Sequence, residues 1–110
     1  MELQEVQETF FLYEEQKHIF IQETQNYFLE RGLNPYIWFD ENHRLRIKYK
    51  YSRKNSTIPE EQKIKVYETV KNFARSKHLE IRFIYEFAET DLLLPKKIQT
   101  QWSTEFIFEV

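Results

Sequence analysis

The sequence predicts an α+β fold in which two helices pack on one face of a four-stranded, mainly antiparallel sheet. Two segments show helical periodicity and four show strand character, in the order α-β-β-α-β-β. The length of 110 residues suits a single domain spanning residues 1–110, because domains cluster near about 100–150 residues. An aromatic content of 17% supplies ample bulk for one core, so we expect the aromatic side chains to lie mostly in that core.

The first predicted helix covers about residues 2–31. Apolar residues recur at steps of three and four between Leu3 and Tyr27, interrupted by two polar residues, Lys17 and Thr24. Gly32 then stands where a helix takes a left-handed residue, and Pro35 prevents a restart. We therefore interpret the chain's single glycine as a helix stop.

A hairpin is predicted over residues 36–51, with turn-forming residues at 40–43. From Arg44 to Tyr51 apolar and basic residues alternate without interruption. Since successive strand side chains point to opposite faces, the bases are expected on one face. The apolar set on the other face is Leu45, Ile47, Tyr49 and Tyr51.

A second helix and two further strands complete the predicted fold. Thr57 and Glu60 match a capping box, and an apolar stripe indicates a helix over residues 58–77, ending near Lys77 or His78. Alternating residues predict strands at 80–89 and 101–110, joined by a segment too long for a tight hairpin.

Charge is unevenly distributed behind a formal net charge of −2. Residues 1–31 hold seven Glu and two bases, a net −5, whereas residues 44–54 hold six bases and no acid. The six bases are Arg44, Arg46, Lys48, Lys50, Arg53 and Lys54. They could track a phosphate backbone or contact an acidic protein. Alternatively, Glu86, Glu105 and Glu109 could pair with them across the sheet, and the pI of 5.9 favours this over nucleic acid.

Two apolar segments are candidates for protein docking. Several apolar residues of the first helix lie outside its main stripe, among them Phe11 and Leu12, with Ile19, Ile21, Phe28 and Leu29 further along. They indicate either self-association or packing on the sheet. The run Leu92, Leu93 and Leu94 before Pro95 is either a docking loop or a cover over an open end of the core.

Little in the sequence indicates catalysis, a metal or a cofactor. The absence of cysteine excludes disulfides and thiolate zinc sites, and one glycine excludes glycine-rich phosphate loops. His18, His43 and His78 are far apart and form no two-histidine motif; His43 beside Asp40 and Glu41 is a weak metal candidate. No apolar run approaches the about 18 residues of a membrane span, and the acidic N-terminus does not resemble a signal peptide.

These observations together predict a small non-catalytic cytoplasmic module that binds protein and forms a homodimer. One alternative is a nucleic-acid-binding module that uses the basic strand of residues 44–54. A second is a small inhibitory or immunity-type protein whose acidic surface covers a basic partner. Abundant Phe, Ile and Lys with scarce Ala and Gly indicate an AT-rich genome, bacterial or phage.

Overall fold

The computed structural model describes residues 3–51, 60–90, 92, 93, 95 and 100–109, with side chains from Glu14 onward except those of residues 90 and 100. It confirms the predicted α+β order. The elements are α1 (Leu3–Leu29), β1 (Tyr36–Phe39), β2 (Leu45–Lys50), α2 (Glu60–Ser76), β3 (Glu80–Thr90) and β4 (Thr100–Glu109). Thr57 of the predicted capping box lies outside the described residues. Within the described part of the chain, no helix combines the length and apolar character needed to cross a membrane.

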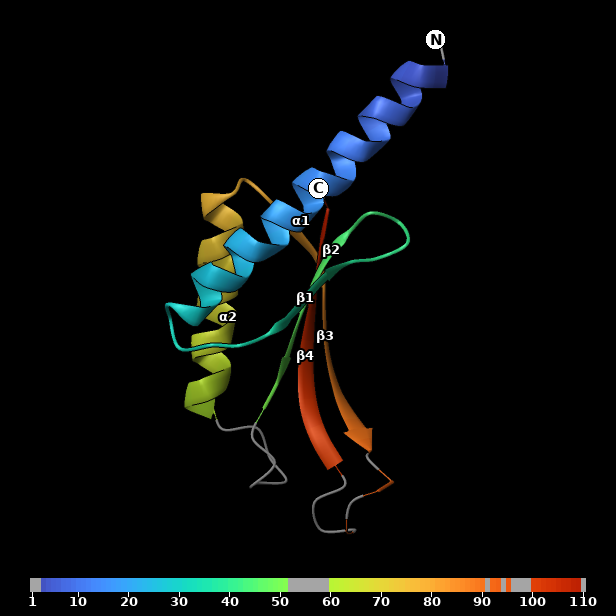
Figure 1. Cartoon of the computed structure of the whole chain (residues 1–110). Helices are drawn as coiled ribbons and strands as arrows, with labels where there is room; N and C mark the ends of the chain where they lie inside the picture. Colours follow the sequence, from blue (N-terminus) through green and yellow to red (C-terminus); the bar gives the residue numbers. More distant parts are fainter. Residues whose placement is uncertain (1–2, 52–59, 91, 94, 96–99, 110) are drawn as a thin grey trace.

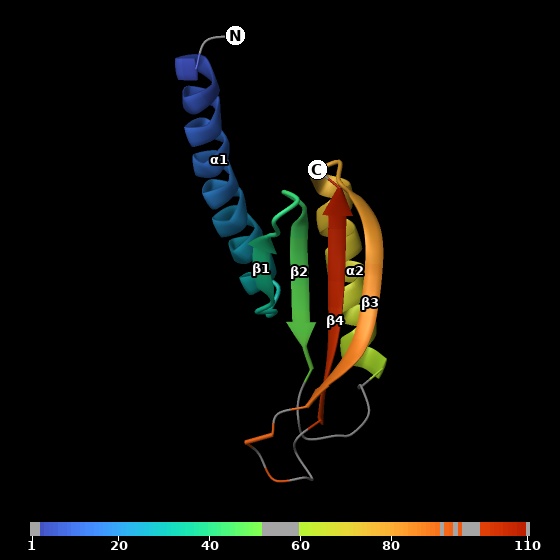
Figure 2. The same cartoon turned by 90° about the vertical axis from the view of Figure 1, so that its right-hand side faces the viewer.

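The four strands form one antiparallel sheet in the order β1-β2-β4-β3. The later part of α1 and all of α2 lie on the same face of this sheet, and the N-terminal part of α1 projects beyond it (Figure 1). The opposite face, turned to the viewer in Figure 2, carries no described helix. We call it the open face. The strands β1 and β3 are the two edges of the sheet.

The core lies between the helices and the inner face of the sheet. The alternation in β2 places Leu45 and Ile47 in the core, and their partners on β4 are Phe108 and Phe106. Phe28 of α1 and Phe73 of α2 join them, all nearly inaccessible to solvent. The predicted apolar face of β2 is therefore confirmed, and it fixes which face of the sheet the bases occupy.

Both helices end with a residue in the left-handed conformation. Gly32 has φ of 76°, and the Leu33 amide donates to the Phe28 carbonyl at 3.0 Å. His78 has φ of 56°, and the Leu79 amide donates to the Ala74 carbonyl at 2.9 Å. In each case an amide donates to the carbonyl five residues earlier, which satisfies a carbonyl that the end of a helix leaves free. The interpretation of Gly32 as a helix stop is confirmed.

A β-bulge in β3 overturns one expectation about the aromatic residues. The register shifts between Ile81 and Phe83, so Ile81 pairs with the inward-facing Phe108 and Phe83 pairs with the outward-facing Ile107. An extra residue at this point reverses the phase of all that follows, because the side-chain period of a strand is two. Phe83 and Tyr85 consequently lie on the open face and are 41% and 48% exposed. They do not join the core.

Candidate interaction surfaces

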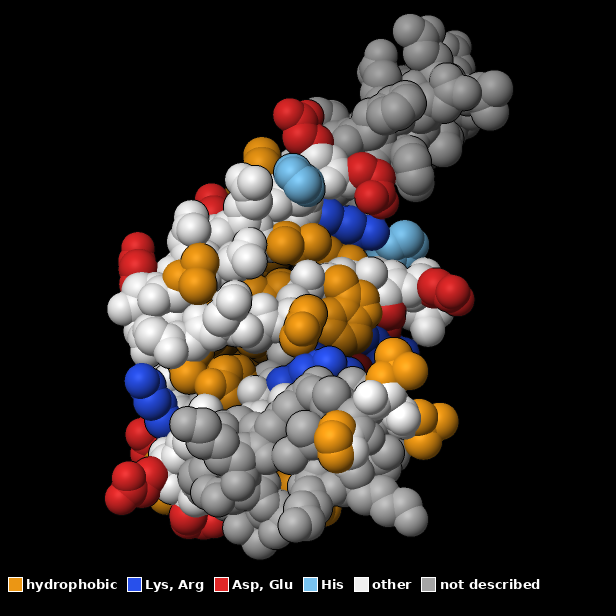
Figure 3. Space-filling view, turned by 60° about the horizontal axis from the view of Figure 1, so that its bottom comes forward, with side chains coloured by type: hydrophobic (Ala, Val, Ile, Leu, Met, Phe, Trp, Pro, Cys, Tyr) orange, Lys and Arg blue, Asp and Glu red, His pale blue; other side chains and the backbone are white. Residues whose placement is uncertain are grey.

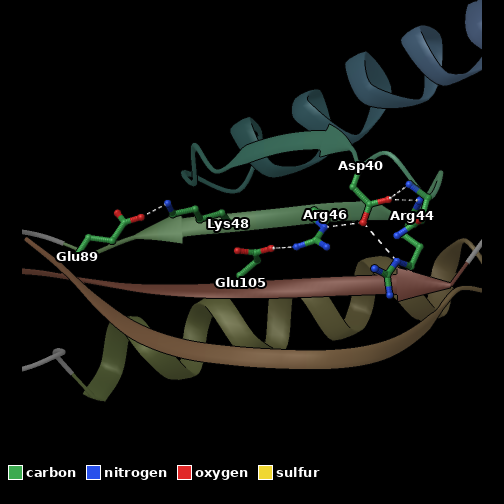
Figure 4. A network of polar contacts seen from close by, with 7 residues as sticks. Asp40, Arg44, Arg46, Lys48, Glu89 and Glu105 are labelled. Atoms are coloured by element: carbon green, nitrogen blue, oxygen red, sulfur yellow. Dashed lines mark hydrogen bonds and ion pairs between the residues drawn. The ribbon is translucent and has the colours of Figure 1, made fainter.

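The basic side chains of β2 lie on the open face, as the alternation predicted. Figure 4 shows two of them, Arg46 and Lys48, together with Arg44 just before the strand, among acidic partners. Arg46 is the centre of the network. Its Nε donates to Asp40 Oδ2 at 2.7 Å, and its Nη1 donates to Glu105 Oε1 at 2.7 Å.

Asp40 closes the β1–β2 turn as well as pairing with arginine. Its Oδ1 accepts hydrogen bonds from the backbone amides of Asn42, at 2.8 Å, and Arg44, at 3.0 Å. Burial opposes ionisation of this carboxyl, but the Arg44 amide, the Arg46 guanidinium and the Asn42 amide outweigh it and lower the pKa to about 2. The same pairing, first with Asp40 and then with Glu105, raises the pKa of Arg46. The turn and the basic strand therefore stabilise each other.

The two lysines of β2 share one acidic partner on β3. Lys48 forms an ion pair and hydrogen bond with Glu89, and Lys50 Nζ lies 3.6 Å from the other oxygen of the same carboxylate. Burial would raise the pKa of Glu89, but the two lysines lower it. Each ammonium also lies over an aromatic ring, Lys48 at 5.3 Å from Phe87 and Lys50 at 5.2 Å from Tyr36. These contacts compensate both positive charges within the sheet.

The sequence predicted ion pairs between the bases of β2 and three glutamates on neighbouring strands, and the structure bears out only part of this set of partners. Glu105 does pair with Arg46, but Glu86 lies on the helix face and pairs with Lys63 of α2 at 3.0 Å. Glu109 instead lies 3.7 Å from Arg82 of β3. The bulge in β3 explains the exchange, because it turns Glu86 inward and brings Glu89 to the open face.

The two remaining bases of the candidate set, Arg53 and Lys54, lie outside the described residues. Among the described ones, blue basic side chains in Figure 3 are scattered among orange hydrophobic and red acidic ones on the face shown. They do not gather into a single basic patch there.

The edge strand β3 carries half-exposed apolar side chains on both sides of the sheet. Phe83 and Tyr85 stack on the open face with their ring centroids 5.9 Å apart and planes 20° from parallel. Ile84 points to the helix face and is still 40% exposed, since β3 is the outermost strand beside β4 (Figure 2). None of these three residues was singled out from the sequence as a contact residue. The pattern of alternation could not reveal them, because the bulge interrupts it.

The candidate docking residues of α1 have different environments. The side chains of Phe11 and Leu12 lie outside the described ones. Phe28 belongs to the core, whereas Ile19 and Leu29 are about half exposed. Lys17 and Thr24, the polar interruptions of the stripe, are buried: Lys17 Nζ contacts His43 Nδ1 at 2.7 Å, and Thr24 donates to the Phe20 carbonyl at 2.6 Å. The buried face of α1 therefore contains Lys17 and Thr24 as well as the apolar residues of the stripe.

The leucine-rich segment after β3 does not cover the core with its described residues. Leu92 is 83% exposed and Leu93 is 95% exposed. Leu94 lies outside the described residues. The interpretation as a cover over the core is therefore wrong for Leu92 and Leu93, and their role in docking stays a prediction.

The features that would indicate metal or substrate binding are few. Across the described residues, no three His, Asp or Glu side chains are grouped closely enough to hold a metal ion. The carboxylate of Asp40, considered with His43 as a weak metal site, already accepts hydrogen bonds from two backbone amides and from the Arg46 guanidinium. A shallow hollow between α1 and the hairpin is lined by His18, Trp38 and Glu41, among others.

Comparison of the chain with protein-family models, with characterised proteins and with solved structures found no match.

The coupling of Asp40 to the basic strand gives a pH-dependent prediction. We expect Asp40→Asn to lower the free energy of unfolding by about 2 kcal/mol at pH 7, because the folded protein keeps this carboxyl ionised to a pKa of about 2 against about 3.9 in the unfolded chain. A lowered pKa contributes stability above pH 4 that is lost as the pH falls toward 2. Urea unfolding of both proteins between pH 7 and pH 2 measures the difference.

The neighbouring exposed Glu41 provides the control for this series. Glu41→Gln removes the same charge from the same turn, and we expect it to change the stability by less than about 0.5 kcal/mol at any pH. A pH-independent difference between wild type and Asp40→Asn would show that Asp40 acts only through the geometry of its turn.

Proposed function

We propose that this chain is a non-catalytic protein-interaction module of the cytoplasm that associates with itself. The observation that carries the proposal is the edge strand β3, where Phe83, Ile84 and Tyr85 stay half exposed beside an edge that no strand of the described residues covers. Large apolar side chains on an unpaired strand edge are a template for pairing with another chain. Leu92 and Leu93, shortly after the end of β3, are two further exposed apolar side chains.

The compensated charges of β2 favour protein over nucleic acid as the partner. Phosphate binding depends on cations that release counterions, whereas Arg46, Lys48 and Lys50 already pair with Asp40, Glu89 and Glu105. Binding a phosphate backbone would require breaking these pairs. The described part of the basic strand is better understood as support for the hairpin and the sheet.

An inhibitory protein with an acidic surface is the second candidate function. The supporting observation is that α1 presents exposed acidic side chains, namely Glu14, Glu15, Glu23 and Glu30. Leaving aside immediate neighbours in sequence, the described residues place a cation near two of these four carboxylates. Lys17 lies near Glu14, and Lys77 lies near Glu23. A basic protein partner would fit this surface.

Sedimentation velocity tests the first proposal. We expect the wild-type chain to sediment with a concentration-dependent increase from monomer to dimer between about 1 and 200 μM, with little sensitivity to salt because apolar contacts drive the association. Titration with a labelled single-stranded or duplex oligonucleotide at low salt should show no saturable binding. A monomer throughout this range, or tight binding that weakens steeply with salt, would contradict the proposal.

A further inference from the structure

We infer that two copies of this chain pair antiparallel through the outer edges of their β3 strands, with Ile84 opposite Ile84 at the two-fold axis. This inference rests on the proposed function and specifies its interface. The dimer would contain one continuous eight-stranded sheet, since each copy contributes four strands with β3 at the edge. Its contact side chains would come from both faces of the sheet.

Among the described residues no strand pairs with the outer edge of β3, and three charged side chains of this strand have partners within the chain. Natural edge strands commonly avoid pairing by exposing charged side chains. On β3, however, Glu86 pairs with Lys63, Glu89 pairs with both lysines of β2, and Arg82 lies 3.7 Å from Glu109. The apolar middle of the strand lies between these neutralised positions. The apolar middle of a second β3 can therefore approach with the flanking charges of Arg82, Glu86 and Glu89 already paired.

The side-chain pattern of β3 selects one register for self-pairing. In an antiparallel pair related by a two-fold axis, opposite residues point to the same face, so each residue must face another that is an even number of positions away. Pairing centred on Ile84 places Ile84 opposite Ile84 on the helix face and Phe83 opposite Tyr85 on the open face. Regular pairing of this kind extends on either side of Ile84 as far as the bulge at Arg82.

Neighbouring registers are less favourable. Centring the pair on Tyr85 would set Ile84 opposite Glu86, an apolar side chain against a carboxylate on the same face. Centring it on Glu86 would place two identical carboxylates opposite each other, which is destabilising. Centring it on Phe83 would move the contact onto the bulge between Ile81 and Phe83, where regular pairing stops. Of the four registers compared, only the one centred on Ile84 matches apolar with apolar and aromatic with aromatic without placing like charges opposite each other or centring on the bulge.

Disulfide trapping tests this register directly, because the chain contains no cysteine of its own. Opposite residues of an antiparallel pair have Cα atoms about 4.5–5.5 Å apart, within the range that a disulfide spans. We expect Ile84→Cys to form a covalent dimer under mild oxidation at low micromolar concentration. Tyr85→Cys, one residue along, should cross-link at least about tenfold more slowly alone, because its counterpart lies two positions away.

An equal mixture of Phe83→Cys and Tyr85→Cys should regain fast cross-linking, since these two positions face each other. Ile19→Cys on α1 is the matched control, at 50% exposure against 40% for Ile84. Ile84→Lys should raise the dimer dissociation constant at least about tenfold while the circular dichroism spectrum stays unchanged. Circular dichroism of each cysteine variant confirms that it folds.

Each outcome separates the inference from the proposed function. If the wild type dimerises while Ile84→Cys cross-links no faster than Ile19→Cys, the β3 register is wrong and self-association survives. Faster cross-linking at Ile19 would place the interface on α1 and overturn the inference. A wild-type chain that stays monomeric at 200 μM would overturn both.

Discussion

Phe73→Ala is expected to lower the free energy of unfolding by about 3–5 kcal/mol, the range for removing a fully buried phenylalanine. Phe73 is completely inaccessible to solvent. Its ring contacts rings from α1 and from the sheet, those of Phe20, Tyr27, Phe28 and Phe108, with centroids 5.4–6.3 Å away. The substitution therefore leaves a cavity where both helices meet the sheet. Small domains have only about 5–15 kcal/mol of total stability, so the substitution removes a substantial part of it.

Urea unfolding at a fixed protein concentration measures this loss. Phe73→Leu keeps most of the side-chain volume, and we expect it to cost clearly less than the alanine variant. Tyr36→Ala provides the matched surface control, because Tyr36 is 57% exposed, and its expected effect is below about 1 kcal/mol. A loss below 1 kcal/mol for Phe73→Ala would show that the helices and sheet do not share this core.

Arg46→Glu combined with Lys48→Glu is expected to destabilise the fold by about 3 kcal/mol without removing any nucleic-acid affinity. Both side chains are largely enclosed and contact acidic partners. Reversal sets new carboxylates beside Asp40, Glu89 and Glu105, and removing one partner of an enclosed ion pair leaves the other uncompensated. Thermal unfolding and oligonucleotide titration of the same samples measure the two effects.

The control for this variant reverses two bases on a surface that lies away from the network. Lys71→Glu with Arg75→Glu makes the same change in net charge on exposed positions of α2, and we expect it to cost less than about 1 kcal/mol. Raising the salt concentration should recover little of the stability lost by the β2 variant, since enclosed charges are weakly screened. The opposite result, intact stability with lost oligonucleotide binding, would assign the strand to nucleic-acid recognition.

Local rules predicted much of the fold because each element depends on nearby residues. Gly32 ends α1 through a conformation that glycine adopts at little cost, and the strict alternation of β2 separates its apolar and basic faces. His78 was expected near the end of α2, and the structure shows that it takes the left-handed position itself. Histidine adopts the left-handed conformation less readily than glycine, so the sequence indicated the end of α2 less clearly than the end of α1.

The candidate site was less predictable, and Glu86 and Glu89 illustrate the reason. Periodicity in β3 pointed to Glu86 as a partner for the basic strand, but the bulge at Arg82 reversed the phase and Glu89 took that place. A bulge depends on how two strands fit together, which a single strand's pattern does not encode. Asp40 was identified only as a turn residue, although it also neutralises Arg46 from across the hairpin.

The sequence by itself determined the order of elements, the end of α1 and the face of the sheet that carries the bases, because hydrophobic periodicity and backbone preferences act over a few residues. Tertiary structure decided which acids neutralise those bases and which apolar side chains stay exposed. It did so through strand order, which makes β3 an edge, and through one extra residue, which turns Phe83 and Tyr85 away from the helices. Both depend on contacts between segments far apart in the chain.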